Sequence, residues 1–213
     1  MELKLDDIEQ FILDSGSDHL GTFGGLFEGG IQCQQVADEL APCILAILES
    51  DNLPTLKFYL EIGSAAGGSA FIINHFLKPD KIVIVDDNQH PKAHIRPYIL
   101  RDIPHVEIIG NSHDTATASR VYDMGVLFDI LLIDGDHFYE GVKADVETYG
   151  EFLRPGGFLI FHDSQIGAPY GCYQVSQALK QDKRWRLVGE FISVKHKPCG
   201  IALFRKVKDE IGF

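Results

Sequence analysis

The sequence contains no apolar run of the roughly 20 residues that a membrane-spanning helix requires. Its start, MELKLDDIEQ, has neither the basic start nor the apolar core of a secretory signal peptide. We therefore expect a cytoplasmic protein that does not insert into a membrane.

Basic residues are scarce relative to acidic ones. The chain has 19 Lys and Arg against 31 Asp and Glu, which gives a formal net charge of −12. Such a balance disfavours duplex nucleic acid and anionic membranes as main partners, because both repel an acidic surface. A small molecule is the simpler expectation for what the protein binds.

Cysteines are few and show no metal-binding spacing. No CxxC pair occurs, so the sequence indicates neither a zinc site nor a disulfide framework. We expect reduced thiols with a structural role. The four are Cys33, Cys43, Cys172 and Cys199.

What the chain does contain is enough apolar material for one substantial core. With 213 residues and 45% hydrophobic content, it suits a single domain, residues 1–213. Residues 1–50 form an N-terminal helical or lid segment in this interpretation, ahead of a core at residues 57–206. The glycine-rich run GTFGGLFEGG is interpreted either as a lid or substrate loop or as an ordinary linker. A helix is predicted at residues 34–48, where Pro42 could introduce a kink.

From residue 57 onward, short apolar runs alternate with amphipathic stretches. This alternation predicts βαβ units and a Rossmann-like, doubly wound α/β sheet that is mostly parallel, with helices on both faces. The last two runs, RLVGEFISV and GIALFRK, are too close for a crossover and therefore predict an antiparallel pair. The earlier strand candidates are KFYLEIG, KIVIVDD, HVEIIG, FDILLID and GFLIFHD, and helices are expected near residues 68–77, 92–102, 114–123, 138–152 and 173–181.

A glycine-bearing turn follows the first strand and opens a helix. Glycines let a ligand approach the backbone, and a helix N-terminus offers unpaired N–H groups, so the turn predicts a nucleotide-type pocket. Ala65 stands where the dinucleotide fingerprint has its second glycine, which weakens a dehydrogenase interpretation. A tight turn without any ligand is the alternative. The cofactor-binding candidates here are Glu61, Gly63, Ser64, Gly67 and Ser69.

The next two strand ends carry further candidates. Asp86 and Asp87 follow the second strand about 20 residues beyond the glycine turn, the spacing at which an acid meets ribose hydroxyls. A solvated acidic turn is the other interpretation. Ser112 follows the third strand and either lines an adenine pocket or caps the next helix.

These residues carry a resemblance to a known family. Through LEIGSAAGGS, Asp86, IDGDHFYEGVKADVE, LRPGGFLIFHD and GIALFRK, the chain resembles class I S-adenosylmethionine-dependent methyltransferases over about residues 57–206. More narrowly, it is similar to metal-dependent small-molecule O-methyltransferases related to macrolide-sugar methyltransferases and to the cephalosporin hydroxylase group. The resemblance implies a seven-stranded sheet whose last strand is antiparallel. It also implies S-adenosylmethionine as cofactor.

Acids and histidines at the fourth and fifth strand ends suggest a metal site. Asp134 ends one strand and His162 and Asp163 end its neighbour, and two carboxylates with an imidazole can hold a divalent ion. Capping carboxylates without an ion are the alternative. The resemblance implies magnesium at Asp134 and Asp163, whereas His162 departs from the family pattern and would suit manganese, iron or zinc. Asp134 also stands as a cofactor-binding candidate, and the resemblance implies that His137 is the general base.

The function predicted from these features is methyl transfer from S-adenosylmethionine to a hydroxyl oxygen of a small molecule. A divalent ion would assist, and a sugar or catechol-like diol is the expected acceptor because vicinal oxygens can chelate the ion. A metal-dependent hydroxylase or hydrolase on the same scaffold is the alternative, and a non-catalytic binding module is a third option. A homodimer is also an open expectation.

Overall fold

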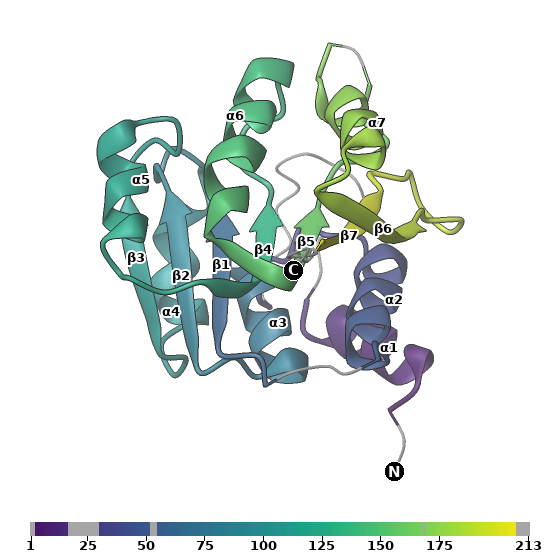
Figure 1. The fold of residues 1–213 in the computed structure, drawn as a ribbon. Coiled ribbons are helices and arrows are strands. Elements are labelled where there is room, and N and C mark those ends of the chain that lie inside the picture. Colours follow the sequence, from purple (N-terminus) through teal and green to yellow (C-terminus); the bar gives the residue numbers. More distant parts are fainter. Residues whose placement is uncertain (1–2, 17–29, 52–54, 168, 208–213) are drawn as a thin grey trace.

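The computed structural model describes residues 3–16, 30–51, 55–167 and 169–207. Figure 1 shows these residues arranged as a twisted sheet with helices on either side. Most of the glycine-rich run predicted as a lid or a linker lies outside the described residues, so that expectation stays a prediction. None of the described helices is both long and apolar enough to cross a membrane.

One seven-stranded sheet organises the described residues, in the order β3-β2-β1-β4-β5-β7-β6. Neighbouring strands from β3 to β5 are parallel, and β7 runs antiparallel to both β5 and β6. The last strand is thus antiparallel as predicted, and it lies inside the sheet while β6 forms the edge. The strands are β1 (Phe58–Ile62), β2 (Lys81–Asp86), β3 (His105–Ile109), β4 (Phe128–Ile133), β5 (Leu153–Phe161), β6 (Trp185–Phe191) and β7 (Ile201–Lys206).

Helices cover both faces of this sheet. Residues of α1 to α4 pack into one apolar cluster with one face of the strands, and residues of α5 to α7 pack into a second cluster with the other face. The near-continuous apolar runs of β2 and β4 follow from this burial on both sides. The helices are α1 (Leu5–Asp14), α2 (Ala37–Leu48), α3 (Gly68–Leu77), α4 (Arg96–Ile99), α5 (Thr115–Tyr122), α6 (Tyr139–Tyr149) and α7 (Cys172–Gln181), with 3-10 turns η1 (Ala93–Ile95) and η2 (Gly150–Phe152).

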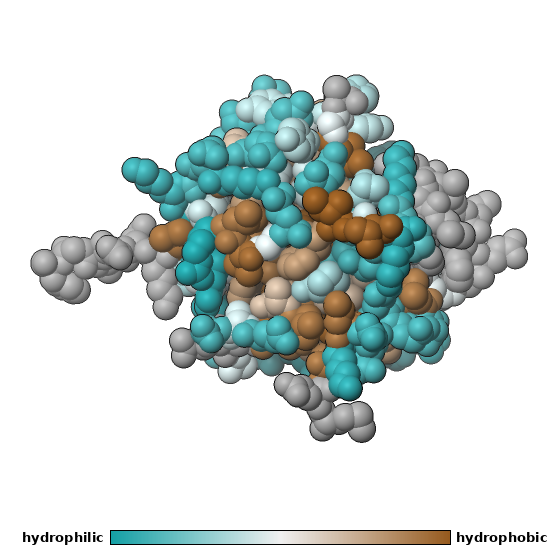
Figure 2. Space-filling view, turned by 90° about the vertical axis from the view of Figure 1, so that its right-hand side faces the viewer, coloured by the Kyte–Doolittle hydropathy of each residue, from teal (hydrophilic) through white to brown (hydrophobic). Residues whose placement is uncertain are grey.

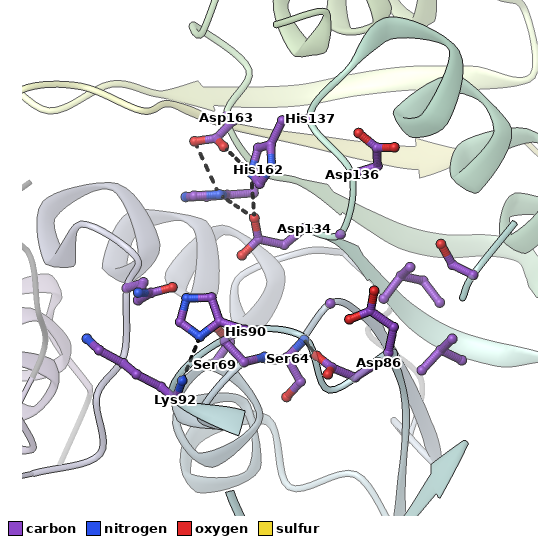
Figure 3. A pocket seen from close by; sticks show the side chains of 18 of the residues that line it. Ser64, Ser69, Asp86, His90, Lys92, Asp134, Asp136, His137, His162 and Asp163 are labelled. Atoms are coloured by element: carbon purple, nitrogen blue, oxygen red, sulfur yellow. Dashed lines mark hydrogen bonds and ion pairs between the residues drawn. The ribbon is translucent and has the colours of Figure 1, made fainter. Parts of the chain in front are cut away.

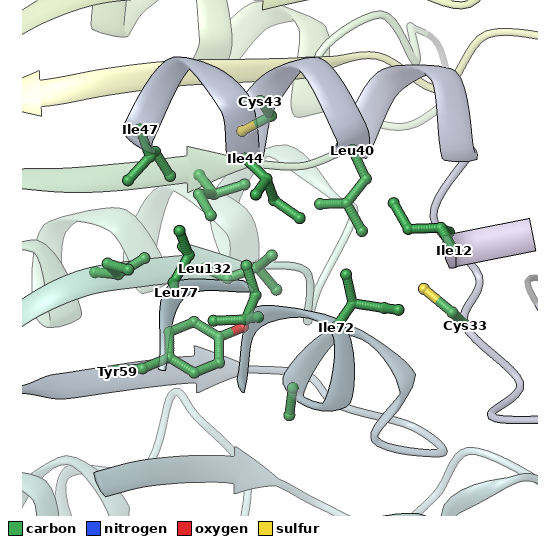
Figure 4. Packing of buried hydrophobic residues seen from close by; sticks show 14 of the residues in the cluster. Ile12, Cys33, Leu40, Cys43, Ile44, Ile47, Tyr59, Ile72, Leu77 and Leu132 are labelled. Atoms are coloured by element: carbon green, nitrogen blue, oxygen red, sulfur yellow. The ribbon is translucent and has the colours of Figure 1, made fainter. Parts of the chain in front are cut away.

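The first cluster is centred on α2, whose apolar side chains face α3 and the sheet (Figure 4). Leu40, Ile44 and Ile47 are fully buried, at the spacing of successive helical turns. The helix continues through Pro42. All four cysteines are free, and Cys33, Cys43 and Cys172 are buried, as expected for structural thiols.

Several predicted boundaries differ from the structure, and helix α2 begins at Ala37 rather than at residue 34. The fifth strand begins at Leu153 rather than at Gly157, because Phe128 on β4 pairs with Leu153 before the register shifts. The helix expected over residues 92–102 is only η1 followed by the short α4.

Candidate active site

A cavity of about 890 Å³ opens at the carboxyl ends of the parallel strands, where α/β sheets bind their ligands. The loops after β1, β2, β3, β4 and β5 all contribute to its lining. Figure 3 shows acids and histidines of the β4 and β5 ends on one side, with Ser64, Ser69 and His90 across from them.

The glycine turn after β1 is pressed against the β4 end. Gly63 has a φ of +79°, and a Cβ on it would lie 2.3 Å from the Asp134 carbonyl oxygen, so only glycine fits there. Gly67, also left-handed, caps α3 without lining the cavity. Ser64 and Ser69 do line it, and their role in cofactor binding stays a prediction.

Glu61 does not face the cavity, which corrects the expectation that its carboxylate meets a ligand. The side chain is fully buried and accepts a 2.5 Å hydrogen bond from the Tyr59 hydroxyl. Because β1 side chains alternate between faces, Glu61 points with Tyr59 toward the α2–α3 side of the sheet. Burial raises the pKa of Glu61 to about 7, although hydrogen bonds from Tyr59 and Ser64 lower it.

The two acids after β2 both line the cavity but have different surroundings. Asp86 Oδ2 accepts the backbone N–H groups of Ser64 and Ala65 at 2.8 and 3.0 Å. Arg96 lies 3.2 Å from the same oxygen. Burial raises the pKa of Asp86, but these donors outweigh it and hold the pKa below its ordinary value. Asp86 therefore holds the glycine turn in place. The exposed Asp87 is more available than Asp86 to accept hydrogen bonds from a ligand.

Ser112 lines the cavity from the loop after β3. The N-cap of α5 is Asp114, so the alternative in which Ser112 caps that helix is wrong. Its carbonyl accepts a 2.8 Å hydrogen bond from Tyr149 of α6, which fixes the loop.

Asp134, His137, His162 and Asp163 meet at one end of the cavity, as the strand-end argument predicts (Figure 3). His162 Nδ1 lies 2.8 Å from Asp134 Oδ1 and 3.4 Å from Asp163 Oδ1. His137 Nε2 lies 2.7 Å from Asp163 Oδ2 and 3.7 Å from Asp134 Oδ1. The backbone at Asp163 is left-handed, with a φ of +55°, a conformation that aspartate tolerates better than most residues.

Electrostatics in this cluster favour charged imidazoles. Burial lowers the pKa of His137, but its hydrogen bonds to Asp134 and Asp163 outweigh burial and raise the pKa to about 10. Burial likewise lowers the pKa of His162, and the charges of the same acids raise it to about 9. Burial raises the pKa of Asp134, yet the two histidines hold it well below its usual range. The two acids of the cluster therefore favour the protonated forms of His137 and His162.

The donor set fits a divalent ion. One ligand atom each from Asp134, His162 and Asp163 lies within 4.8 Å of the other two. His162 Nε2 is buried and has no hydrogen-bond partner, so part of the ring's bonding capacity is unused. Because magnesium prefers oxygen ligands, two carboxylates with one imidazole suit manganese, iron or zinc better than magnesium.

Gln35, just before α2, joins the two halves of the cavity and was not predicted. Its Nε2 donates to Asp134 Oδ2 at 2.6 Å, and its Oε1 accepts from the Ser69 hydroxyl at 2.6 Å. Arg96 was also missed, although it bonds the carbonyl of Ala65 and the carboxylate of Glu107, both at 3.1 Å. Neither residue belongs to a motif, and each reaches the site only through the folded chain.

Aromatic side chains border the cavity next to the acid and histidine cluster. Phe138 is 60% exposed and Tyr170 is 36% exposed. Their ring centroids lie 5.6 Å apart, and that of His137 lies 6.0 Å from Tyr170. Ile166 lines the cavity as well, so this end offers apolar surface beside its charged groups.

The fold is that of the class I methyltransferases: a β3-β2-β1-β4-β5-β7-β6 sheet with a glycine turn and two acids at the edge where the cavity opens. The model of a family described as a methyltransferase domain matches residues 60–164. This match supports the resemblance to class I S-adenosylmethionine-dependent methyltransferases seen in the sequence.

Individual relatives are distant. Uncharacterized protein R132 of Acanthamoeba polyphaga mimivirus is 28% identical over 123 residues, which is 55% of this chain and 54% of that protein. The chain thus spans about half the length of this curated relative.

Solved structures of methyltransferases are similar to this chain in fold. An O-methyltransferase from Bacillus cereus in complex with S-adenosylhomocysteine is 15% identical, with a TM-score of 0.63 over 96% of this chain and 90% of that one. The MycE methyltransferase of the mycinamycin biosynthetic pathway, in complex with magnesium and S-adenosylhomocysteine, is 20% identical. Its TM-score is 0.60, over 100% of this chain and 57% of that chain.

Proposed function

We propose that the protein transfers the methyl group of S-adenosylmethionine to a hydroxyl oxygen of a small molecule, with help from a divalent ion. One observation carries the proposal: a glycine turn, the exposed acid Asp87 and a group of possible metal ligands line the same cavity. Each feature alone has a structural alternative, but their convergence on one volume favours a joint role.

S-adenosylmethionine supplies an electrophilic methyl group on a sulfonium, and the chain's part is to hold it. The turn at Gly63 and Ser64 allows close approach of the backbone, and the N-terminus of α3 lies beside it. Asp87 accepts ribose hydroxyls, while Asp86 and Arg96 keep the turn in place. The loop at Ser112 borders the base.

Asp134, Asp163 and His162 would hold the ion, which lowers the pKa of a hydroxyl that it contacts. An ion held by Asp134 and Asp163 would offset part of their negative charge. These carboxylates would then stabilise the protonated form of His137 less, so the neutral ring could accept a proton more readily. His137 then takes the proton of the acceptor hydroxyl. Asp163, 2.7 Å from His137, orients that ring.

The acceptor binds at the end of the cavity bordered by Phe138, Ile166 and Tyr170. A hydroxylated compound that offers two adjacent oxygens to the ion and an apolar face to these side chains fits this surrounding. Catechol-like diols satisfy both conditions, and sugar diols satisfy the first.

Titration calorimetry of the pure protein with S-adenosylhomocysteine, with and without Mg²⁺ or Mn²⁺, tests the cofactor. Transfer of labelled methyl groups to catechol-type and sugar diols tests the reaction. We expect Asp134→Asn and Asp163→Asn to lower the transfer rate at least a hundredfold, and Asp123→Asn, an exposed acid after α5, to leave it unchanged. Absence of any S-adenosylhomocysteine binding would overturn the proposal.

A second candidate, a metal-dependent hydroxylase, is favoured only by His162. An imidazole beside two carboxylates approaches the donor set of redox-active iron sites. Elemental analysis that finds tightly held iron, together with absent methyl transfer, would select this alternative.

A further inference from the structure

The loop between β6 and β7, residues 192–200, lies against the segment that follows β5. The backbone N–H groups of Ser164 and Gln165 donate to the carbonyls of Gly200 and Cys199, both at 3.0 Å. Cys199 also lines the cavity. Because the end of β5 carries part of the acid and histidine cluster, this β6–β7 loop borders the end of the cavity where the acceptor is proposed to bind.

One buried carboxylate holds both ends of the β6–β7 loop. Glu39, in the first turn of α2, has 0% exposure. Its Oε1 accepts the backbone N–H of Ser193 at 2.8 Å, and its Oε2 accepts that of Gly200 at 2.9 Å. Burying a carboxylate is costly unless it is hydrogen-bonded, and here the bonds that compensate are made to the loop. The loop is therefore fixed to α2 and not only to its own strands.

The backbone inside the loop is ordered as well. The Ser193 hydroxyl oxygen accepts the N–H groups of Lys195 and His196 at 3.2 and 2.9 Å. Pro198 restricts the residue before it, Lys197, to extended backbone conformations. The position of Lys197 is thus set by a local turn on one side and by a proline on the other.

The two lysines of the loop have different surroundings. Lys195 forms an ion pair with Glu9 of α1 and lies outside the cavity lining. Lys197 is exposed and lines the cavity, and it has no ion-pair or hydrogen-bond partner in the part of the chain that the structure describes. The chain has 31 acids against 19 basic residues, so its unpaired ammonium does not reflect a shortage of acids. This ammonium is available to an anion that enters the cavity.

We propose that Lys197 binds a carboxylate of the acceptor, so that the substrate is a diol that carries a carboxylate rather than a neutral diol. The inference rests on the proposed methyl transfer and names the class of its substrate. An ammonium offers three donors and a full charge to a carboxylate. With its hydroxyls at the acid and histidine cluster and its carboxylate at Lys197, the acceptor is held at two points, which orients the reacting oxygen. A bound acceptor also displaces water from the cavity, which strengthens the charge pair relative to one on an open surface.

Calorimetric titration of acceptors into the protein loaded with S-adenosylhomocysteine and Mn²⁺ tests this site without requiring turnover. The probes are 3,4-dihydroxybenzoate against 4-methylcatechol and, for sugar diols, glucuronate against glucose. We expect the wild-type protein to bind the carboxylate compound at least fivefold more tightly than its neutral partner in one of these pairs. Lys197→Met should bring that ratio to within twofold, and Lys195→Met is the matched control that should keep the wild-type ratio.

Two further measurements separate charge recognition from packing. Raising the salt concentration from about 0.05 to about 0.5 M should lower the wild-type ratio and leave that of Lys197→Met unchanged, because salt screens the charge pair. Lys197→Glu should prefer 4-(2-aminoethyl)catechol, which carries an ammonium, over 3,4-dihydroxybenzoate.

The cofactor also carries a carboxylate, so the affinity for S-adenosylhomocysteine is measured in the same variants. We expect Lys197→Met to bind it within twofold of the wild-type protein, and a larger loss would assign Lys197 to the cofactor and overturn the inference. No preference for the carboxylate compound in either pair, or a preference that Lys197→Met retains, would also overturn it while leaving the proposed function intact. Failure of the wild-type protein to bind S-adenosylhomocysteine would overturn the proposed function and this inference with it.

Discussion

At the residue scale, two side chains that hold the site in place, Gln35 and Arg96, could not be found from the sequence. Gln35 shows this best, because its amide bonds Asp134 of β4 and Ser69 of α3 at once. Its amino group donates to a carboxylate on one side, and its carbonyl oxygen accepts from a hydroxyl on the other. The orientation of Asp134 toward the histidines therefore depends on a side chain that lies 99 residues earlier in the chain.

Replacing Gln35 by Leu removes this link while keeping the volume similar. Asp134 Oδ2 and the buried Ser69 hydroxyl then each lose a hydrogen-bond partner, which costs about 1–3 kcal/mol. We expect the free energy of unfolding, measured in urea, to fall by that amount and methyl transfer to fall with it. Gln174→Leu on the exposed side of α7 is the control. A variant as stable and active as the wild-type protein would show that Gln35 does not hold Asp134.

Glu61 is predicted to make stability depend on pH. Burial raises its pKa from 4.5 to about 7, so the folded chain binds this proton more tightly than the unfolded chain does. The resulting stabilisation is complete below about pH 4.5 and is lost as the pH rises through about 7, a total on the order of 3 kcal/mol.

The variant Glu61→Gln keeps an uncharged group of the same shape and removes this titration. We expect it to unfold at the same urea concentration as the wild-type protein near pH 4.5 and to be more stable near pH 8. Glu49→Gln, exposed after α2, is the control. If the difference between Glu61→Gln and the wild-type protein does not change between these pH values, the carboxylate does not titrate as described.

At the element scale, Arg96 shows how a short helix can fasten three strands. Its guanidinium reaches Asp86 at the end of β2, Glu107 on β3 and the carbonyl of Ala65 after β1. The side chain is 1% exposed, so its charge is compensated almost entirely by these partners.

Arg96→Met is expected to destabilise the protein by about 3–5 kcal/mol, because Asp86 and Glu107 lose a buried counter-charge. Urea unfolding measures this loss, and S-adenosylhomocysteine affinity should fall with it since Asp86 braces the glycine turn. The control is Arg101→Met, whose wild-type side chain is exposed and pairs only with the adjacent Asp102 among the contacts described. Equal stability of the two variants would contradict the bracing role.

The sequence predicted each strand and most helices because their apolar patterns are strong. The α3 bounds matched the predicted 68–77 range, since a left-handed residue ends that helix at each side. The 92–102 segment was predicted less well because its polar contacts, not its periodicity, decide where it is helical. In the site, strand-end reasoning found Asp134, His137, His162 and Asp163, because the ends of neighbouring parallel strands must meet. It could not find Gln35 or Arg96, whose positions depend on tertiary packing.

At the scale of the whole molecule, one side is less polar than a net charge of −12 leads one to expect. Figure 2 looks onto the side formed by α1, α2 and the β6–β7 hairpin, where apolar residues gather toward the middle among polar ones. Leu187, Val188, Ile192 and Val194 are between 38% and 92% exposed. They lie on or next to β6, the edge strand of the sheet.

A homodimer through this edge is the association we propose, because exposed apolar side chains on an edge strand favour contact with another chain. The register shift between Leu187 and Gly189 disfavours continuous strand pairing, so the contact should be made by side chains. Light scattering after gel filtration is expected to give a dimer for the wild-type protein and a monomer for the double variant Leu187→Lys, Val194→Lys. Leu127→Lys, at a similarly exposed position before β4, should remain dimeric. A wild-type protein that stays monomeric across the micromolar range would refute the dimer, whereas a dimer that survives the double variant would place its interface elsewhere.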